Sequence, residues 1–291
     1  MPTGKSEESL KLVQPETVSP TATGTESALP GLLEQPHERG RLGVLIALLT
    51  LVAAWIDMLS YLFLGHVFAS FMTGNFLFIG LGAAQGNSGL LIRALVAVLA
   101  LLGGVTFGSF YLGRVAQQQS ETAWHRTFAR YLLMEWLLLL VYAILWLVTS
   151  NLSKQAGVQI VLLGVAALGM GIQGALIMAL KIPGVVGDAL TATVIVLGQH
   201  LAQDLDHRGP GSQEWRWSGL FMALLCLIYV GTAFVVALTS AFALTAVVPV
   251  IVVTIAIVTL LVPLRQSARS SPIHSSKGLS PPEAGPKEDG N

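Results

Sequence analysis

Charged residues are scarce in this chain. Only 11% of its 291 residues are Asp, Glu, Lys or Arg, whereas an average soluble domain has about 25%. The charges that are present gather in the two end regions and in short connections between apolar runs. Acidic and basic residues balance at 16 each, so the composition gives no indication of a nucleic-acid partner. The scarcity of charge argues against an ordinary soluble domain.

Cysteine and the common catalytic motifs are also nearly absent. The one cysteine, Cys226, lies inside an apolar run, which excludes a disulfide framework and a thiolate metal site and indicates a packing role. The chain has no HExxH, GxSxG or P-loop pattern, and two histidines near helix breaks, His66 and His200, are too few for a typical zinc site. We therefore expect no metal, no cofactor and no enzymatic activity.

Long apolar runs are what the chain has in abundance. Several reach about 20 residues, the length that crosses the ~30 Å hydrocarbon core of a bilayer as a helix. The sequence therefore predicts an all-α polytopic membrane protein, with the lipid bilayer as its main surrounding. The long segments are expected at about 42–64, 90–112, 131–149, 158–180, 220–238 and 241–264, and two shorter ones at about 68–84 and 189–201.

The two end regions differ from the rest in composition. Residues 1–40 and 266–291 are rich in small and polar residues and proline, and contain no long apolar run. Such segments bury too little apolar surface to offset the conformational entropy lost on folding. We expect disordered tails on either side of a membrane domain that spans 41–265.

Two semi-polar segments repeat each other. Phe71-Met72-Thr73-Gly74-Asn75 is echoed 118 positions later by Ala189-Leu190-Thr191-Ala192-Thr193, and a glycine-containing break precedes each copy. In the neighbouring long segments, Gly104 matches Gly231. The pattern predicts two halves, 42–150 and 158–265, of four elements each. Chance similarity between apolar helices is the alternative explanation.

The distribution of basic residues favours six crossings over eight. If both short segments turn back, then the 114–130 loop, Lys181 and the 203–217 connection join both tails on one face, which the positive-inside tendency assigns to the cytoplasm. Three crossings per half also invert the halves relative to each other, as in transporters with a site near the midplane. We predict six spanning helices plus two short re-entrant or broken helices in two inverted pseudo-repeats, with both termini cytoplasmic. Eight spanning helices are the alternative.

Several of these motifs resemble the YoaK-like family of bacterial and fungal integral membrane proteins, a family of unknown function. The resemblance is carried by Trp55-Ile56-Asp57, Phe71-Met72-Thr73-Gly74-Asn75, Gly169-Met170-Gly171-Ile172-Gln173, Thr191-Ala192-Thr193 and Leu197-Gly198. It covers about 42–265 and implies the membrane fold and the motif positions, but no reaction. The family often has Gln-Asn in place of Gln173-Gly174 and Thr-Gly in place of Thr191-Ala192, which argues against Gly174 and Ala192 as ligands.

Asp57 is the first candidate site residue. A carboxylate at the centre of a membrane helix costs about 2.5–3.5 kcal/mol on insertion scales, so its side chain should face the bundle interior and have a partner. We expect either a proton or cation site, or a structural hydrogen-bond anchor that holds the re-entrant segment. Glu135 and Arg93 lie about one turn inside their predicted helices, so we expect their side chains to reach the membrane interface.

The semi-polar segments supply the other candidates, which are Thr73, Gly74, Asn75, Thr191 and Thr193. Their hydroxyl and amide groups, with backbone carbonyls freed where Gly74 loosens the helix, would line a polar site between the halves. The alternative is interhelical hydrogen bonding alone, which averages about 0.6 kcal/mol per bond in membranes. Gln173 is expected to be a neutral counterpart of Asp57 in the second half.

The function that these features favour is transport of a small solute, a proton or another ion across the cell membrane, through a midplane site between the two halves. A non-transporting membrane scaffold or partner subunit is the alternative, because polar residues that merely hold helices together have the same sequence pattern. The sequence carries no indication of solute identity or oligomeric state.

Overall fold

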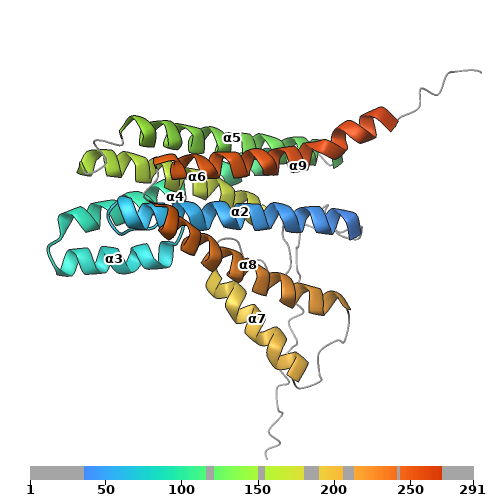
Figure 1. The fold of residues 1–291 in the computed structure, drawn as a ribbon, viewed down its shortest axis with the longest axis horizontal. Coiled ribbons are helices and arrows are strands. Elements are labelled where there is room, and N and C mark those ends of the chain that lie inside the picture. The colour runs from blue at the N-terminus through green and yellow to red at the C-terminus, as the bar shows by residue number, and fades with distance from the viewer. Residues whose placement is uncertain are drawn as a thin grey trace, which may run out of the picture.

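The computed structural model describes residues 36–115, 121–149, 155–179, 190–205, 213–240 and 243–270, which form helices and short turns without a strand (Figure 1). The helices are α2 (Pro36–Phe63), α3 (Met72–Ala84), α4 (Ser88–Val115), α5 (Glu121–Val148), α6 (Ala156–Ala179), α7 (Leu190–Leu205), α8 (Gln213–Thr239), the 3-10 helix η2 (Ala243–Val247) and α9 (Val248–Ser270). The prediction of an all-α protein is confirmed. The predicted tails lie mostly outside the described residues.

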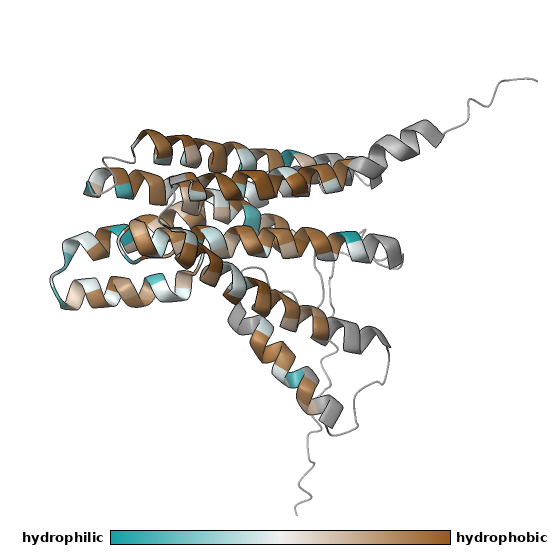
Figure 2. Cartoon of the chain, in the orientation of Figure 1, coloured by the Kyte–Doolittle hydropathy of each residue, from teal (hydrophilic) through white to brown (hydrophobic). Residues whose placement is uncertain are grey.

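Six helices are long and apolar enough to cross a bilayer. Their candidate spans are Gly40–Phe63, Ser88–Tyr111, Thr127–Val148, Ala156–Ala179, Gly219–Thr239 and Leu244–Leu261. Apolar residues, brown in Figure 2, occupy these helices along most of their described length. The 13 residues of α3 extend only about 20 Å at 1.5 Å per residue, too short for a ~30 Å core. The 16-residue α7 is also shorter than the six spans.

Several helix boundaries differ from the sequence-based expectation, and proline is the reason at two of them. The first membrane helix begins at Pro36 rather than near residue 42, because proline is tolerated in the first turn, where its missing N–H has no helical partner. Pro249 is the second residue of α9, just after η2, so it lies at a helix start rather than at a kink within a helix. Hydropathy alone locates neither boundary.

The helices pack around α2 and α6. α2 contacts α8, α9 and α6, whereas α6 contacts α4 and α5, and α5 also packs on α9. α6 is the most enclosed span, with 67% of its most apolar stretch buried, and α4 is the least, with 17%. The large apolar side chains on the outer surfaces of α4 and α8 therefore face the surrounding lipid.

The chain reverses direction directly after α2. Gly65 and His66 both have positive φ angles, of 95° and 61°, and this turn occurs where the sequence predicts a break. The next residues run back along α2, and α3 then returns beside α4, antiparallel to it (Figure 1). The start of α4 therefore lies at the same end of the bundle as the end of α2. Residues 64–84 form a re-entrant hairpin.

The second short helix lies at the opposite end of the molecule. α7 packs on α8, and Figure 1 shows the pair inclined away from the other helices, below the bundle and to the right of α3. The connection that precedes α7 is outside the described residues. Each short helix thus packs on the long helix that follows it, α3 on α4 and α7 on α8.

Candidate functional site

Asp57 is on α2 and lies beside the inner turn of the hairpin, which is at Ser70. Its side chain is 2% exposed. One carboxyl oxygen, Oδ1, accepts the backbone N–H of Ser70 at 2.7 Å. The other, Oδ2, accepts the Ser70 hydroxyl at 2.7 Å and the Tyr229 hydroxyl from α8 at 2.9 Å. Asp57 is six residues before the end of α2, about 9 Å inside it at 1.5 Å per residue. The carboxyl group therefore joins α2, the hairpin and α8 at lipid depth.

Asn75 holds the same hairpin from its other side. Its side chain is fully buried, its Oδ1 accepts the backbone N–H of Phe68 at 3.0 Å, and its Nδ2 donates to the Phe68 carbonyl at 2.6 Å. One amide group thus satisfies both backbone polar groups of a residue outside any helix. Irregular backbone needs such internal partners inside a membrane, because the hydrocarbon core offers none.

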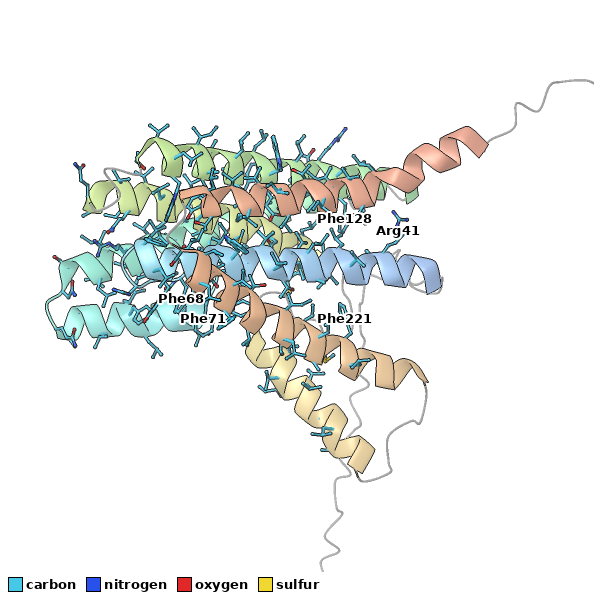
Figure 3. The ribbon with its side chains drawn as sticks, viewed as in Figure 1. Arg41, Phe68, Phe71, Phe128 and Phe221 are labelled. Atoms are coloured by element: carbon cyan, nitrogen blue, oxygen red, sulfur yellow. The ribbon has the colours of Figure 1, made fainter. Side chains whose placement is uncertain are left out.

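Aromatic rings surround this hairpin turn. The Phe68 ring is stacked 5.2 Å from Tyr61 and 6.0 Å from Phe78 between ring centroids, and it meets Phe71 edge-on at 5.3 Å. Figure 3 shows Phe68 and Phe71 on the half of the bundle away from Arg41. A Cβ atom on Gly74 would lie 2.7 Å from the Phe71 ring. Gly74 lies within the helical part of α3, so it leaves room for these rings rather than unwinding the helix.

The other predicted site residues lie apart from Asp57. Thr73 is on α3 with an exposed side chain, and Thr193 is buried on α7, whereas the side chain of Thr191 is outside the described residues. Gln173 is fully buried on α6 and donates to the Leu49 carbonyl of α2 at 2.9 Å. Leu49 is eight residues before Asp57, which places these two contacts about 12 Å apart along α2. The structure places Asp57 and Asn75 in contact with the same hairpin, whereas Thr73 is in that hairpin with its side chain exposed and Gln173 lies elsewhere.

Sequence reasoning missed Ser70 and Tyr229, the two donors to Asp57. Ser70 directly precedes the semi-polar motif, and Tyr229 carries a hydroxyl into the apolar run of α8, so both had a signal in the pattern of polar groups within apolar surroundings. The expectation for Glu135 was wrong. Because α5 begins at Glu121 rather than near residue 131, Glu135 lies deep in the helix and is fully buried instead of reaching the interface.

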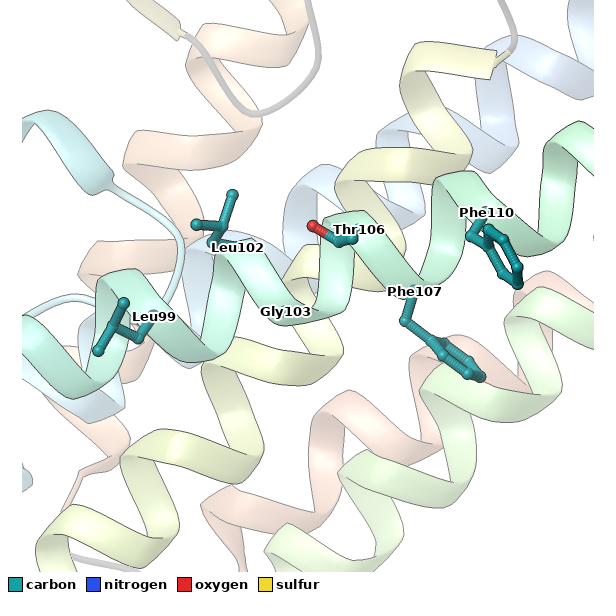
Figure 4. Close-up of a pocket in the computed structure, with 6 residues that line it drawn as sticks. All are labelled: Leu99, Leu102, Gly103, Thr106, Phe107 and Phe110. Atoms are coloured by element: carbon teal, nitrogen blue, oxygen red, sulfur yellow. The ribbon is translucent and has the colours of Figure 1, made fainter.

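An apolar groove of about 560 Å³ lies on the outer surface of α4, away from the hairpin turn (Figure 4). It is lined by Leu99, Leu102, Gly103, Thr106, Phe107 and Phe110. This groove faces the lipid and is almost entirely apolar, so it does not suit a charged or polar solute. Asp57, by contrast, is closed off from the surface in this conformation, and its two oxygens are occupied by protein donors.

Comparisons with known proteins agree with the membrane fold. The family model described as "Protein of unknown function (DUF1275)" matches residues 45–261. UPF0700 transmembrane protein YoaK of Bacillus subtilis (strain 168) is 27% identical over 196 residues, which cover 67% of this chain and 83% of that protein. No solved structure matches. The resemblance to the YoaK-like family is thus confirmed, and this multi-pass membrane protein belongs to the DUF1275 family.

Proposed function

We propose that the chain is a small secondary transporter or channel-like permease that moves a small solute or an ion across the membrane. The observation that carries this proposal is a buried carboxyl group, Asp57, at the inner turn of a re-entrant hairpin. Charged residues at membrane depth are costly, and they usually mark ion or substrate pathways. Broken helices with a site near the midplane are a recurrent transporter arrangement.

The pairing of the helices supports an inverted repeat. α3 packs on α4 as α7 packs on α8, α4 packs on α6 as α8 packs on α2, and α5 packs on α6 as α9 packs on α2. Exchanging α2 to α5 with α6 to α9 therefore converts each of these contacts into another that is present. The two short helices also lie at opposite ends of the molecule (Figure 1). In the proposed mechanism, α3 and α7 each control access from their own side of the membrane.

The described conformation is then an occluded one. Asp57 is closed off by the hairpin turn and by Tyr229, so access to it requires the hairpin to move away from α8. Such a movement separates Ser70 from Tyr229 while α2 stays in place. Asp57 is the group that takes up the proton or ion, and the solute occupies the space that opens between the halves.

We also propose that the protein lies in the cytoplasmic membrane of the cell, with both termini on the cytoplasmic side. The start of α2 and the end of α9 lie towards one end of the bundle (Figure 1). Arg41 and Arg130 occupy described positions near that end, in agreement with the positive-inside tendency. Single cysteines in the 114–130 loop, in a Cys226→Ser background, should react with an impermeant maleimide from the same side as the tails. Reaction from the other side supports eight crossings.

Flux through proteoliposomes tests the transport proposal. The probes are an internal pH-sensitive dye for protons and radioactive sodium for Na⁺, with Asp57→Asn, Asn75→Ala and the wild type compared at equal protein density. We expect Asp57→Asn to abolish flux and Asn75→Ala to reduce it, whereas Thr73→Ala, on the exposed side of α3, retains the wild-type rate. Unchanged flux in both Asp57→Asn and Asn75→Ala would remove these residues from the mechanism.

A non-transporting scaffold is the second candidate, and the bonding of Asp57 favours it. Both carboxyl oxygens have donors and the side chain is 2% exposed, as expected of an anchor. Val67→Cys in the Cys226→Ser background separates the two, because Val67 is fully buried at the hairpin turn. A transporter exposes this thiol to a charged, water-soluble reagent during turnover, whereas a scaffold keeps it unreactive. His66→Cys, at an exposed position, is the positive control.

A further inference from the structure

We propose that Asp57 is the anionic ligand of a site for one monovalent cation, Na⁺ or a proton, whose other oxygens come from Ser60, Ser70 and Tyr229. The site rests on the proposed function in one respect, since the cation would be the ion whose movement is coupled to transport. Nothing in the family comparison assigns such a site to any member.

Three of the four oxygen donors are already together. The Ser70 hydroxyl lies 2.7 Å and the Tyr229 hydroxyl 2.9 Å from the same Asp57 oxygen, Oδ2. They come from the hairpin and from α8, so the group brings together three separate elements. A hydroxyl group can both donate and accept a hydrogen bond. It can therefore rotate from donating to a carboxylate to coordinating a cation with its oxygen lone pair. The empty site and the loaded site therefore need little rearrangement of these side chains.

The buried hydroxyl group of Ser60 is the fourth oxygen of the proposed site. Its side chain is fully buried, and its hydroxyl has no hydrogen-bond partner among the described residues. Ser60 follows Asp57 by three residues, and residues three apart lie on the same side of a helix. Buried polar groups in native structures nearly always have a partner, and a bound cation next to Asp57 supplies one.

The charge of the surroundings selects a cation. The donors to Asp57 from Ser70 and Tyr229 are neutral, and neither α3 nor α6 carries an ionisable side chain. The ionisable groups on the other facing elements are Arg93 on α4, whose side chain packs against Gly65 at the start of the hairpin, Tyr229 and Cys226 on α8, and the exposed His66 in the hairpin, while α2 itself also carries Tyr61 and, one bundle length away, Arg41. Hard cations prefer oxygen ligands, and a single carboxylate balances a single positive charge. An anion would meet an uncompensated carboxylate here.

Binding of the cation should hold the hairpin closed. The ligands lie on α2, on the hairpin and on α8, so a cation shared by them resists separation of the hairpin from α8. A ligand that binds the folded state and not the unfolded state raises the unfolding temperature as its concentration increases. Thermal unfolding of the purified, full-length protein in detergent therefore reports the site without any transported solute.

The experiment measures the unfolding temperature in NaCl against choline chloride at equal ionic strength, and across a pH series. The variants are Asp57→Asn, Ser60→Ala and Tyr229→Phe, with Ser109→Ala and Tyr111→Phe on α4 as matched controls. For a Na⁺ site, NaCl raises the unfolding temperature of the wild type and the controls, and Asp57→Asn abolishes this response. Ser60→Ala and Tyr229→Phe, which each lose one hydroxyl, shift the half-maximal Na⁺ concentration about tenfold upward, equivalent to one weakened ligand contact.

A proton site gives a different result. NaCl then has no effect, but the pH dependence of the unfolding temperature differs between the wild type and Asp57→Asn, and Ser60→Ala shifts it while Ser109→Ala does not. The proposal is overturned if neither Na⁺ nor pH distinguishes Asp57→Asn from the wild type, or if Ser60→Ala and Tyr229→Phe both behave like their controls. Cation binding without flux in proteoliposomes would instead contradict the transport function and leave the site. Flux in proteoliposomes without any effect of Na⁺ or pH on unfolding would contradict the cation site and leave the transport function.

Discussion

The contact between α4 and α6 and the contact between α2 and α8 are built in opposite ways, although the proposed repeat makes them counterparts. Between α4 and α6 the backbones touch. A Cβ atom on Gly104 would collide with the Leu168 carbonyl, and one on Gly171 would collide with the Leu101 carbonyl and lie 2.9 Å from the Gly104 Cα. Small residues allow this approach, as the sequence predicts for Gly104. The Tyr131 hydroxyl also donates to the Gly108 carbonyl at 2.5 Å, which ties α5 to α4.

The contact between α2 and α8 has no such backbone approach. Gly231 is the sequence counterpart of Gly104, yet a Cβ atom there would meet nothing within 4 Å. The described polar link between these helices is instead the hydrogen bond from Tyr229 to Asp57. Interdigitated backbones cannot separate without losing close packing along the whole interface, whereas a side-chain hydrogen bond can open locally. From this difference we predict that α4 and α6 stay packed and that the hairpin and α8 are the parts that separate.

The largest expected effect comes from breaking the rigid contact. Gly171→Leu places a side chain where the Leu101 carbonyl and the Gly104 Cα now lie, so we expect a loss of more than about 3 kcal/mol of unfolding free energy. Gly231→Leu, at the sequence counterpart of Gly104 on α8, is the control and should remain near wild-type stability, because this residue is exposed and open space surrounds it. Unfolding in detergent measures both. Equal destabilisation by the two variants would remove the distinction between the contacts.

Removing the carboxyl group should have the next largest effect. Asp57→Ala leaves the Ser70 N–H and two hydroxyl groups without their acceptor in a buried place, which we expect to cost about 1–3 kcal/mol in unfolding free energy. The reactivity of Val67→Cys should rise in the same background, because the hairpin is no longer held. An unfolding free energy like that of the wild type, with no gain in reactivity, would show that Asp57 does not hold the hairpin.

Asn75→Ala should act on the hairpin alone. It removes both hydrogen bonds to the Phe68 backbone, and we expect amide hydrogen exchange at residues 67–70 to increase strongly while α4 and α6 keep their protection. The loss of unfolding free energy should be smaller than for Asp57→Ala, because fewer buried groups lose a partner. Thr73→Ala, two residues away and exposed, is the control. Uniform loss of protection across the bundle would contradict a separately moving hairpin.

Two tyrosine variants sharpen the comparison with the smallest energies. Tyr131→Phe and Tyr229→Phe each delete one hydroxyl hydrogen bond, so each should cost only about 0.6 kcal/mol, the average for such bonds in membranes. Their effects on access should differ, because Tyr229 covers Asp57 beside the hairpin whereas Tyr131 ties α5 to α4, so we expect only Tyr229→Phe to increase the reactivity of Val67→Cys. Similar reactivity in both backgrounds would mean that the Tyr229 bond does not control opening.

Much of the fold follows from the residues alone. Apolar length identifies the six long helices, and the Gly65-His66 pair marks the turn of the hairpin, because both are local consequences of composition. The candidate site was anticipated in part. Asp57 and Asn75 stand out as polar groups within apolar runs, but Thr73 has the same signal and points outward. Which side of α3 faces the bundle depends on its partner α4, and a 13-residue helix that is apolar except for Thr73 and Asn75 does not show its buried face in its pattern.

The sequence by itself determined that this is a helical membrane protein with six long spans and a polar motif at a helix break, because insertion into lipid depends on apolar length and on the cost of each polar group. Only the tertiary structure decided that Asp57 and Asn75 both hydrogen-bond to the same hairpin and that Tyr229 of α8 donates to Asp57. It also decided that Gly104, and not Gly231, forms a close backbone contact. These outcomes depend on how distant helices are rotated and how closely they approach. No local pattern of residues records either quantity.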